Sequence, residues 1–528
     1  MRTCRLLARA GDLKEAVAAA RRAVELTAWD AAAWANLAEL HRAGGDIESA
    51  SAAYAQAAAL APNAPHVRAA LAECLAQSNR LDAAERQFSA AGALAPGDAR
   101  VAVGMARLAL AGNAPERAAQ IAREGLEHDP ENGALHDALG AALEALGETE
   151  AACRHYEQAT RLAPALARPW LSLAAHHRAA RRYAQARATL EAAADAVPMN
   201  AASTRVLTAL ADVYIAGGEH ERARDALARA LALAPGDDRL LVRYGSVLRA
   251  LNQPREALAV LQAAPQGADV QSRAEAAYEM ALAYDMLDEL ASALSAAQIA
   301  AAGRPDEALY QATLGRVALK AGRADIAVDA LNAAIATTDA DPDLYNLLGR
   351  AYHALNDPRR AMEAHTLALR MQPDTLDYQF DFALAARDAG QHEAAVIALR
   401  EVVAVRPDHA QAQLALGLSL EAVKCWQDAY HALTAATVSL PDDPAPHQAL
   451  GRVCMHLRNP ECAIAALNAA LKLDPDDVAS YHLLGEAYSA LGRVDEAVRA
   501  FHQALERCPD DAAQHAAIGA ALVDLGAH

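Results

Sequence analysis

An alanine returns at a nearly constant interval along almost the whole chain. Twelve of the fourteen gaps between successive members of this series are 34 residues, and the two exceptions are 37 and 36 residues. A period of this size indicates a stack of similar supersecondary units, because each unit buries its apolar face only against its neighbours. The series consists of Ala16, Ala50, Ala84, Ala118, Ala152, Ala186, Ala223, Ala257, Ala293, Ala327, Ala361, Ala395, Ala429, Ala463 and Ala497.

The amino-acid composition favours helices for these units. Hydrophobic residues make up 54% of the 528 residues but aromatic residues only 4%, so the interior must be built mainly from Ala and Leu. Both residues are strong helix formers. We therefore expect an all-α chain whose helices pack closely.

The stretch Pro342–Thr375 represents one full period. Its apolar residues fall into two groups with helical spacing, which the turn residues Asn356–Pro358 separate and Pro373 closes. Two short amphipathic helices joined by a tight turn are what this pattern predicts. A proline near the end of the second helix stops it before the next repeat begins.

The residues at fixed offsets of the repeat resemble the tetratricopeptide repeat family over essentially the whole chain. In the repeat that starts at 478 they are Tyr481, Leu484, Gly485, Tyr488, Ala497, Phe501, Ala504 and Pro509. The resemblance implies an α-solenoid, a right-handed superhelix of helix-turn-helix pairs. It also implies that the first helix of each pair lines a concave groove, which receives partner peptides or domains.

The period divides the chain into fourteen repeats over residues 31–511. Residues 1–30 fit a truncated first repeat, and residues 512–528 fit a C-terminal capping helix. Two interruptions, near 199–203 and 265–273, add three and two residues. Each either lengthens a loop between repeats, which costs little free energy, or changes the superhelical pitch and forms a hinge. The expected repeat starts are 31, 65, 99, 133, 167, 204, 238, 274, 308, 342, 376, 410, 444 and 478.

Charge and the absence of a membrane signal restrict the partners and the compartment. The formal net charge is −19, which argues against nucleic acid or an anionic membrane surface as a general partner. No uncharged apolar stretch approaches the length of a membrane span, and Gly11, Asp12 and Lys14 interrupt the N-terminus before a signal-peptide core can form. We therefore expect a cytoplasmic protein.

The cysteines predict neither a disulfide framework nor a zinc site. There are seven of them, with no CxxC spacing. Cys454 and Cys462 are expected on paired helices, where they can be near neighbours. We interpret the cysteines as small buried hydrophobic residues in a reducing compartment.

No catalytic motif is complete, so we expect no enzymatic activity, no cofactor and no metal. His392-Glu393 lacks the second histidine of a zinc-protease motif, and neither a phosphate-binding GxxxxGK[ST] nor an acyl-transfer GxSxG is present. His177 lies on the packing face of a predicted first helix. Such a histidine is more often a core residue than a ligand, because metal sites need three or four convergent ligands.

Arginines gather at the positions that the family resemblance assigns to the groove. These are the second, fifth, sixth, ninth, twelfth and thirteenth positions of each repeat. A row of arginines there can hold carboxylates or phosphates through forked hydrogen bonds, although charged rows also serve only as solvated surface. The candidate partner-binding residues, all within 99–250, are Arg100, Arg107, Arg168, Arg178, Arg205, Arg239, Arg243 and Arg249.

Two recognition modes of the family fit poorly. Arg239 and Arg243 match two positions of a five-residue carboxylate clamp, but the other three positions would be Leu171, Ala175 and Ala209, which cannot donate hydrogen bonds. An asparagine ladder at the sixth position is reduced to one member, Asn36. Binding is therefore expected to depend on side-chain charge and shape.

The sequence favours a non-catalytic scaffold that binds a peptide or protein surface, most readily an acidic one, in the concave groove. The alternative is that the chain is the repeat portion of a larger enzyme, such as a glycosyltransferase, or of an exopolysaccharide-export or secretion assembly. Self-association through the ends of the solenoid is a further possibility.

Overall fold

The computed structural model describes residues 13–263, 270–338, 341–507 and 512–524. Within these ranges every regular element is an α-helix, which confirms the predicted all-α solenoid of helix pairs. The chain divides into two compact parts, which we call the N-terminal half (Met1–Pro265) and the C-terminal half (Gln266–His528). The division lies at the second interruption of the repeat, whose residues 264–269 are outside the described ranges, so the expected hinge stays a prediction.

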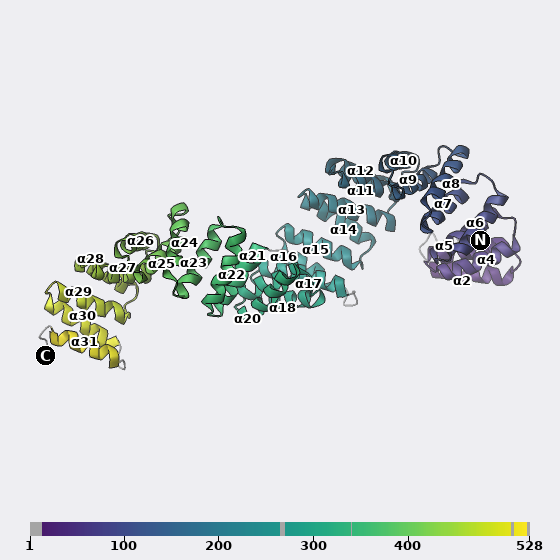
Figure 1. Cartoon of the computed structure of the whole chain (residues 1–528). Coiled ribbons are helices and arrows are strands. Elements are labelled where there is room, and N and C mark those ends of the chain that lie inside the picture. Colours follow the sequence, from purple (N-terminus) through teal and green to yellow (C-terminus); the bar gives the residue numbers. More distant parts are fainter. Residues whose placement is uncertain (1–12, 264–269, 339–340, 508–511, 525–528) are drawn as a thin grey trace. The chain divides into compact units, whose positions relative to one another are not determined.

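Within the N-terminal half, successive helices form antiparallel hairpins that stack in chain order (Figure 1). Their bounds are α2 (Leu13–Leu26), α3 (Ala31–Ala43), α4 (Ile47–Leu60), α5 (Pro65–Gln77), α6 (Leu81–Leu94), α7 (Ala99–Ala111), α8 (Pro115–His128), α9 (Gly133–Ala145), α10 (Thr149–Leu162), α11 (Ala167–Ala179), α12 (Tyr183–Ala196), α13 (Ala201–Ala216), α14 (His220–Leu233), α15 (Asp238–Ala250) and α16 (Pro254–Gln262).

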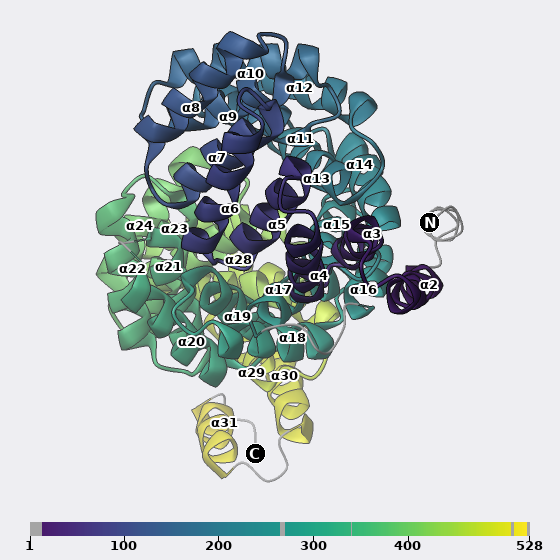
Figure 2. The same ribbon diagram turned by 90° about the vertical axis from the view of Figure 1, so that its right-hand side faces the viewer.

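The C-terminal half repeats the same arrangement, which a second view also shows (Figure 2). Its helices are α17 (Val270–Met286), α18 (Leu290–Gly303), α19 (Ala308–Lys320), α20 (Ala324–Thr337), α21 (Pro342–Ala354), α22 (Pro358–Met371), α23 (Leu376–Asp388), α24 (His392–Val405), α25 (Ala410–Ala422), α26 (Trp426–Ser439), α27 (Pro444–His456), α28 (Pro460–Leu473), α29 (Val478–Ala490), α30 (Val494–Arg507) and α31 (Ala512–Asp524).

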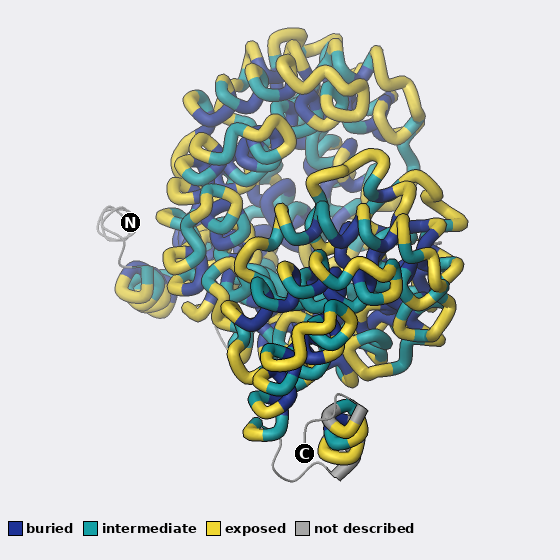
Figure 3. Tube along the Cα trace, turned by 90° about the vertical axis from the view of Figure 1, so that its left-hand side faces the viewer, coloured by how far each residue is buried: buried dark blue, intermediate teal, exposed yellow. Residues whose placement is uncertain are grey.

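The core of each half is built from small residues packed against large ones. All fifteen alanines of the 34-residue series are 0% exposed, so each stands where two helix backbones approach and no larger side chain fits. Where the eighth position of a repeat is glycine, a large side chain from the second helix packs directly against it. A Cβ at Gly485 would lie 2.5 Å from the ring of Phe501, and one at Gly140 would lie 2.7 Å from the ring of Tyr156. Figure 3 shows that the buried segments lie along the helices and that the turns between helices are mostly exposed.

The turn inside each hairpin depends on one backbone position. The fifteenth residue of each of the fourteen predicted repeats has a φ between 56° and 80°, the left-handed region that favours Gly and Asn. Gly45 and Asn79 are examples, and a helix can end and reverse within two residues there. Asp and Asn at the start of many first helices accept backbone N–H bonds, as Asp30 and Asn132 do.

The two interruptions do more than lengthen the loops between repeats, because their extra residues extend the helices that follow. Most first helices have 13 residues, whereas α13 has 16 and α17 has 17. Asn200 caps α13 by accepting hydrogen bonds from the N–H groups of Ala202 and Ser203. The first helices of these two repeats therefore begin at 201 and 270, ahead of the predicted starts at 204 and 274.

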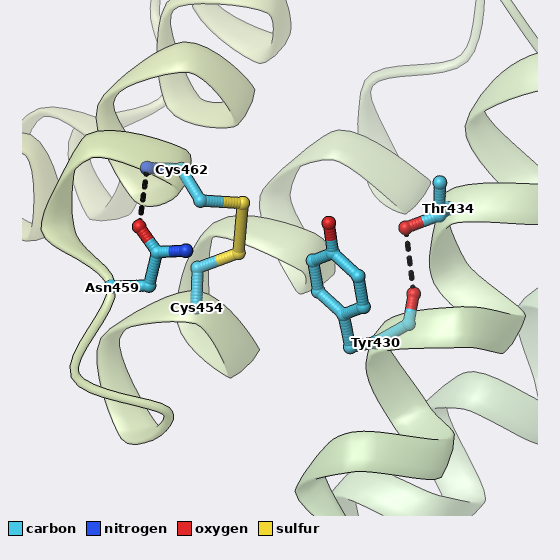
Figure 4. The surroundings of a disulfide bond; sticks show 5 residues. All are labelled: Tyr430, Thr434, Cys454, Asn459 and Cys462. Atoms are coloured by element: carbon cyan, nitrogen blue, oxygen red, sulfur yellow. Dashed lines mark hydrogen bonds between the residues drawn. A yellow bond between two sulfur atoms is a disulfide. The ribbon is translucent and has the colours of Figure 1, made fainter.

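The cysteine prediction is wrong for one pair, because Cys454 on α27 and Cys462 on α28 form a disulfide (Figure 4). Their Cα atoms are 5.9 Å apart, within the range that a disulfide spans. The cap of α28 fixes one end, since Asn459 accepts a hydrogen bond from the Cys462 N–H at 3.1 Å. Among the other cysteines that the structure describes, Cys74 is buried as expected, but Cys425 is exposed.

Candidate functional site

The eight candidate arginines all lie on first helices of the N-terminal half. Arg100 and Arg107 belong to α7, Arg168 and Arg178 to α11, Arg205 to α13, and Arg239, Arg243 and Arg249 to α15. In each half, the term first-helix face means the second, fifth, sixth, ninth, twelfth and thirteenth positions of that half's repeats. On this face the N-terminal half has nine arginines and five acidic residues.

Glu73 on α5 bridges the arginines of two flanking repeats. Its carboxylate accepts hydrogen bonds from Arg100 Nε at 3.1 Å and Nη2 at 3.3 Å, and from Arg42 Nη1 at 3.2 Å. The hydrogen bond to Glu73 raises the pKa of the Arg100 guanidinium, so this arginine keeps its charge. One carboxylate between two guanidinium groups leaves a net positive charge at this point.

Asp137 on α9 forms the same kind of bridge, but it is buried, with 1% of the side chain exposed. Arg168 donates from Nε to both carboxylate oxygens, at 2.9 and 3.1 Å, and from Nη2 to the Asp137 main-chain oxygen at 2.9 Å. Arg107 Nη2 lies 3.4 Å from the same carboxylate on the other side. A buried carboxylate requires such partners, so these two arginines join α7, α9 and α11.

The remaining candidates divide into one paired arginine, three unpaired ones and Arg249. Arg243 donates to both oxygens of Asp212, at 2.8 and 3.1 Å. Arg178, Arg205 and Arg239 are exposed, and their side chains make no ion pair within the described part of the chain. Arg205, Arg239 and Arg243 line one pocket of about 340 Å³, and Asp212 and Thr208 are also in its lining. The structure thus brings these three candidates together.

The acidic partners of the arginines were missed by the sequence reasoning, although the sequence contains a signal for them. Ion pairs between first helices recur at a separation of 31 residues, as in Asp137–Arg168 and Asp212–Arg243. The C-terminal half has the same separation in Asp285–Arg316 and Glu421–Arg452. This separation is the 34-residue period less three, and three residues are nearly one helical turn. A search for opposite charges at this offset finds these pairs.

A large pocket of the N-terminal half adjoins the first of these bridges. It has a volume of about 720 Å³ and is lined mainly by α5, α7 and the start of α9. Arg42, Glu73, Arg100 and Arg107 stand at its charged side. Apolar lining comes from Phe88, Val103 and Leu108 and from several alanines. It combines charge with an apolar surface, as binding pockets commonly do.

The net charge is divided unevenly between the two halves. Residues 1–265 contain 29 Lys and Arg against 30 Asp and Glu, which gives a formal charge of −1. Residues 266–528 contain 19 against 37, which gives −18. The overall acidity of the chain is therefore a property of its C-terminal half.

The described residues contain neither a metal-binding cluster nor a candidate membrane span. No group of three or more His, Cys, Asp or Glu side chains among them could hold a metal ion. In the same ranges no helix combines the length and the apolar character that a bilayer span requires.

Family models described as tetratricopeptide repeat match segments from both halves of the chain. The matched residues are 7–74, 41–108, 134–168, 204–247, 312–374, 380–444, 425–478 and 455–522. No curated protein sequence matches the chain.

Solved structures with a similar fold include a crystal structure of MamA, 24% identical, with a TM-score of 0.31 over 32% of this chain and 92% of that one. The Cut9 and Hcn1 hetero-tetramer of the APC/C is 15% identical over 92% of this chain and 95% of that one, with a TM-score of 0.36. PilW, a type IV pilus biogenesis factor, is 19% identical over 41% of this chain and 96% of that one, also with a TM-score of 0.36.

Proposed function

Because the chain belongs to the tetratricopeptide repeat family, we propose that it is a non-catalytic scaffold whose N-terminal half binds an acidic peptide or protein surface on its first-helix face. The observation that carries this proposal is the excess of arginine there, nine arginines against five acidic residues, in a chain whose net charge is −19. An excess of guanidinium groups attracts carboxylates and can bind them through two parallel hydrogen bonds.

This face carries two kinds of arginine. Arg100, Arg107, Arg168 and Arg243 hold carboxylates of the chain itself, so their first role is to join neighbouring repeats. Arg178, Arg205 and Arg239 are exposed and form no ion pair with the described residues, so their donors are available to a partner. A guanidinium has five N–H donors, and the paired arginines therefore also keep some of theirs.

The test is a charge reversal of the three available arginines, R178E/R205E/R239E, in the full chain. The probe is a fluorescein-labelled oligoglutamate peptide, and binding is followed by fluorescence anisotropy. We expect the affinity to fall at least about tenfold, because three favourable charge interactions become repulsive. Raising the salt concentration should weaken the binding of the parent protein as well.

The matched control is R161E/R229E/R255E, which changes the net charge equally. These three arginines lie on the second helices α10, α14 and α16, are exposed, and form no ion pair with described residues. The control should bind the probe nearly as well as the parent protein. Equal losses in both triple variants would mean that only net charge matters, and the proposed binding face would be wrong.

The compartment is part of the proposal. We propose a cytoplasmic protein, because Cys74, Cys153 and Cys425 are free. The Cys454–Cys462 disulfide is the observation against this location, since structural disulfides persist mainly in oxidising compartments. Cell fractionation of the native host, with non-reducing peptide mapping of each fraction, tests this point. Recovery of the linked peptide only from an oxidising compartment would contradict the cytoplasmic location.

A further inference from the structure

We propose that the pocket between α5, α7 and α9 holds one bulky apolar side chain of the acidic partner segment. This inference rests on the proposed function. It adds an apolar side chain to the acidic groups that the proposed function assigns to the partner. The pocket of about 720 Å³ is within the size range of small-molecule sites, so it has room for a large side chain.

The pocket exists because small residues occupy positions on α5, α7 and α9 where larger ones would fill the space. Ala76, Ala99, Gly104, Ala111 and Ala134 all line it. Ala76 and Ala99 are half-buried, and Ala111 is exposed at the end of α7. No side chain of the described residues fills this volume, so an entering group meets apolar surface rather than displacing a packed neighbour.

Gly104 is a distinctive feature of this pocket. It is the only glycine at the sixth position of the fourteen repeats. A Cβ at this position would lie 2.3 Å from two atoms of the Phe88 ring, so only glycine allows Phe88 to pack here. Phe88 comes from the second helix of the preceding repeat and, with Val103 and Leu108, makes the pocket apolar.

The charged side of the pocket determines which apolar segment fits. The lining contains three arginines, Arg42, Arg100 and Arg107, but a single acidic residue, Glu73. It therefore has a net positive charge. The ion pairs to Glu73 and Asp137 use only one donor nitrogen each of Arg42 and Arg107. Their remaining N–H groups can bind carboxylates on either side of an inserted side chain. An acidic segment with one central Phe, Leu or Trp has this complementarity, whereas a basic segment would be repelled.

The experiment compares two fluorescein-labelled oligoglutamate peptides on the full chain, one with a central Phe and one with a central Ala. We expect the Phe peptide to bind about tenfold more tightly, because it alone buries a large apolar side chain. Two substitutions that fill the pocket, Val103→Trp and Ala111→Phe, should each reduce this ratio to about one while the Ala peptide binds as before. Ala111 is exposed, so Ala111→Phe keeps the test valid if Val103→Trp fails to fold.

Matched controls place the same side chains outside the pocket. Leu171→Trp lies at the fifth position of another repeat, as Val103 does, and Ala145→Phe lies at the thirteenth position, as Ala111 does. Neither residue lines the pocket, and both controls should keep the tenfold ratio.

Each outcome decides one of the two claims. Equal binding of the Phe and Ala peptides by the parent protein, or a ratio that persists in both filled variants, would overturn the apolar pocket. A serine-based peptide with a central Ala tests the scaffold proposal separately. If it binds as well as the glutamate-based Ala peptide, the preference for acidic partners is wrong, whatever the Phe ratio shows.

Discussion

The two halves of the chain are built from the same kind of repeat, but the charge of the first-helix face differs between them. On the first-helix face the N-terminal half has nine arginines and five acidic residues, whereas the C-terminal half has five basic and nine acidic residues. In the C-terminal half the basic residues of this face are all held by acidic neighbours, as Arg316 and Lys320 are by Asp285.

This difference shows that the packing positions and the face positions of the repeat vary independently. The buried alanines and the glycines opposite large side chains are shared by both halves, so both fold as stacked hairpins. The charged face residues join neighbouring repeats through ion pairs rather than through the alanine and glycine contacts of the core, so this face can carry opposite charge in the two halves. A stack of this kind can present different surfaces along its length, because each repeat contacts only its neighbours.

The largest expected effects come from replacing a large buried side chain with alanine at the same position of the repeat in each half. Phe88→Ala in the N-terminal half and Phe501→Ala in the C-terminal half should each lower the free energy of unfolding by about 3–5 kcal/mol, because both side chains are 1% exposed. Urea unfolding measures this loss. Only Phe88→Ala should also weaken binding of the Phe-containing glutamate peptide, and equal binding by both variants would contradict the role of Phe88 in the pocket.

A pH effect of about 3 kcal/mol is expected at His365, which lies on α22 of the C-terminal half. Burial lowers the pKa of His365 to about 4 from 6.5, and its ring lies near Asp381, Arg350 and His353. Its Nδ1 lies 2.7 Å from Asn346 Oδ1. The unfolded chain binds a proton more readily than the folded one between these pKa values, so the stabilisation is present above pH 6.5 and is lost as the pH falls toward 4.

Hydrogen exchange of α21 and α22 as a function of pH measures this loss. His365→Leu is the matched variant, because Leu331 and Leu433 occupy the same position opposite glycine in other repeats. It should remove most of the pH dependence between 6.5 and 4. An unchanged slope in the variant would assign the effect to another group.

Reduction of the disulfide should destabilise the C-terminal half by about 2–3 kcal/mol, since the Cys454–Cys462 bridge closes a short loop around one hairpin turn. The described cysteines of the N-terminal half, Cys74 and Cys153, are free. Thermal unfolding with and without reductant, for the parent protein and Cys454→Ser, tests this difference. An identical response to reductant in the variant would show that the bridge is not its source.

The smallest predicted effect concerns the acidic partners of the face arginines. Asp212→Asn releases Arg243 in the N-terminal half, and the oligoglutamate peptide should bind about two- to fivefold more tightly, a modest gain because the pair is exposed. Asp285→Asn releases Arg316 and Lys320 in the C-terminal half. It should leave the affinity nearly unchanged, because acidic residues still dominate that face. Equal gains in both variants, measured by anisotropy, would remove the functional difference between the halves.

The repeat made most of the fold predictable, because its signal lies in the identity of single residues. The alanine series and the Leu-Gly pairs placed the packing positions, and most first helices begin at the predicted residue, as α3 does at Ala31 and α29 at Val478. The early start of α13 was also readable, since Asn200 is a strong N-cap residue that the period alone overlooks. The number of repeats and the capping role of residues 512–528 stay predictions.

The site was less predictable, because it depends on contacts between repeats. The sequence predicted that eight arginines lie on one face. It did not predict that the carboxylates of Glu73, Asp137 and Asp212 form ion pairs with four of them. The pocket at Gly104 depends on where the Phe88 ring packs across a repeat boundary, which no residue pattern specifies. The bond between Cys454 and Cys462 likewise requires the distance between two helices.

The most direct test of the central claim is hydrogen exchange of the full chain with and without the Phe-containing glutamate peptide, analysed by mass spectrometry. The peptide should slow exchange in α7, α11, α13 and α15, which carry eight of the nine face arginines, and leave the C-terminal half unchanged. Slower exchange in the C-terminal half alone would contradict the assignment of acidic partners to the N-terminal half, as would a complete absence of change.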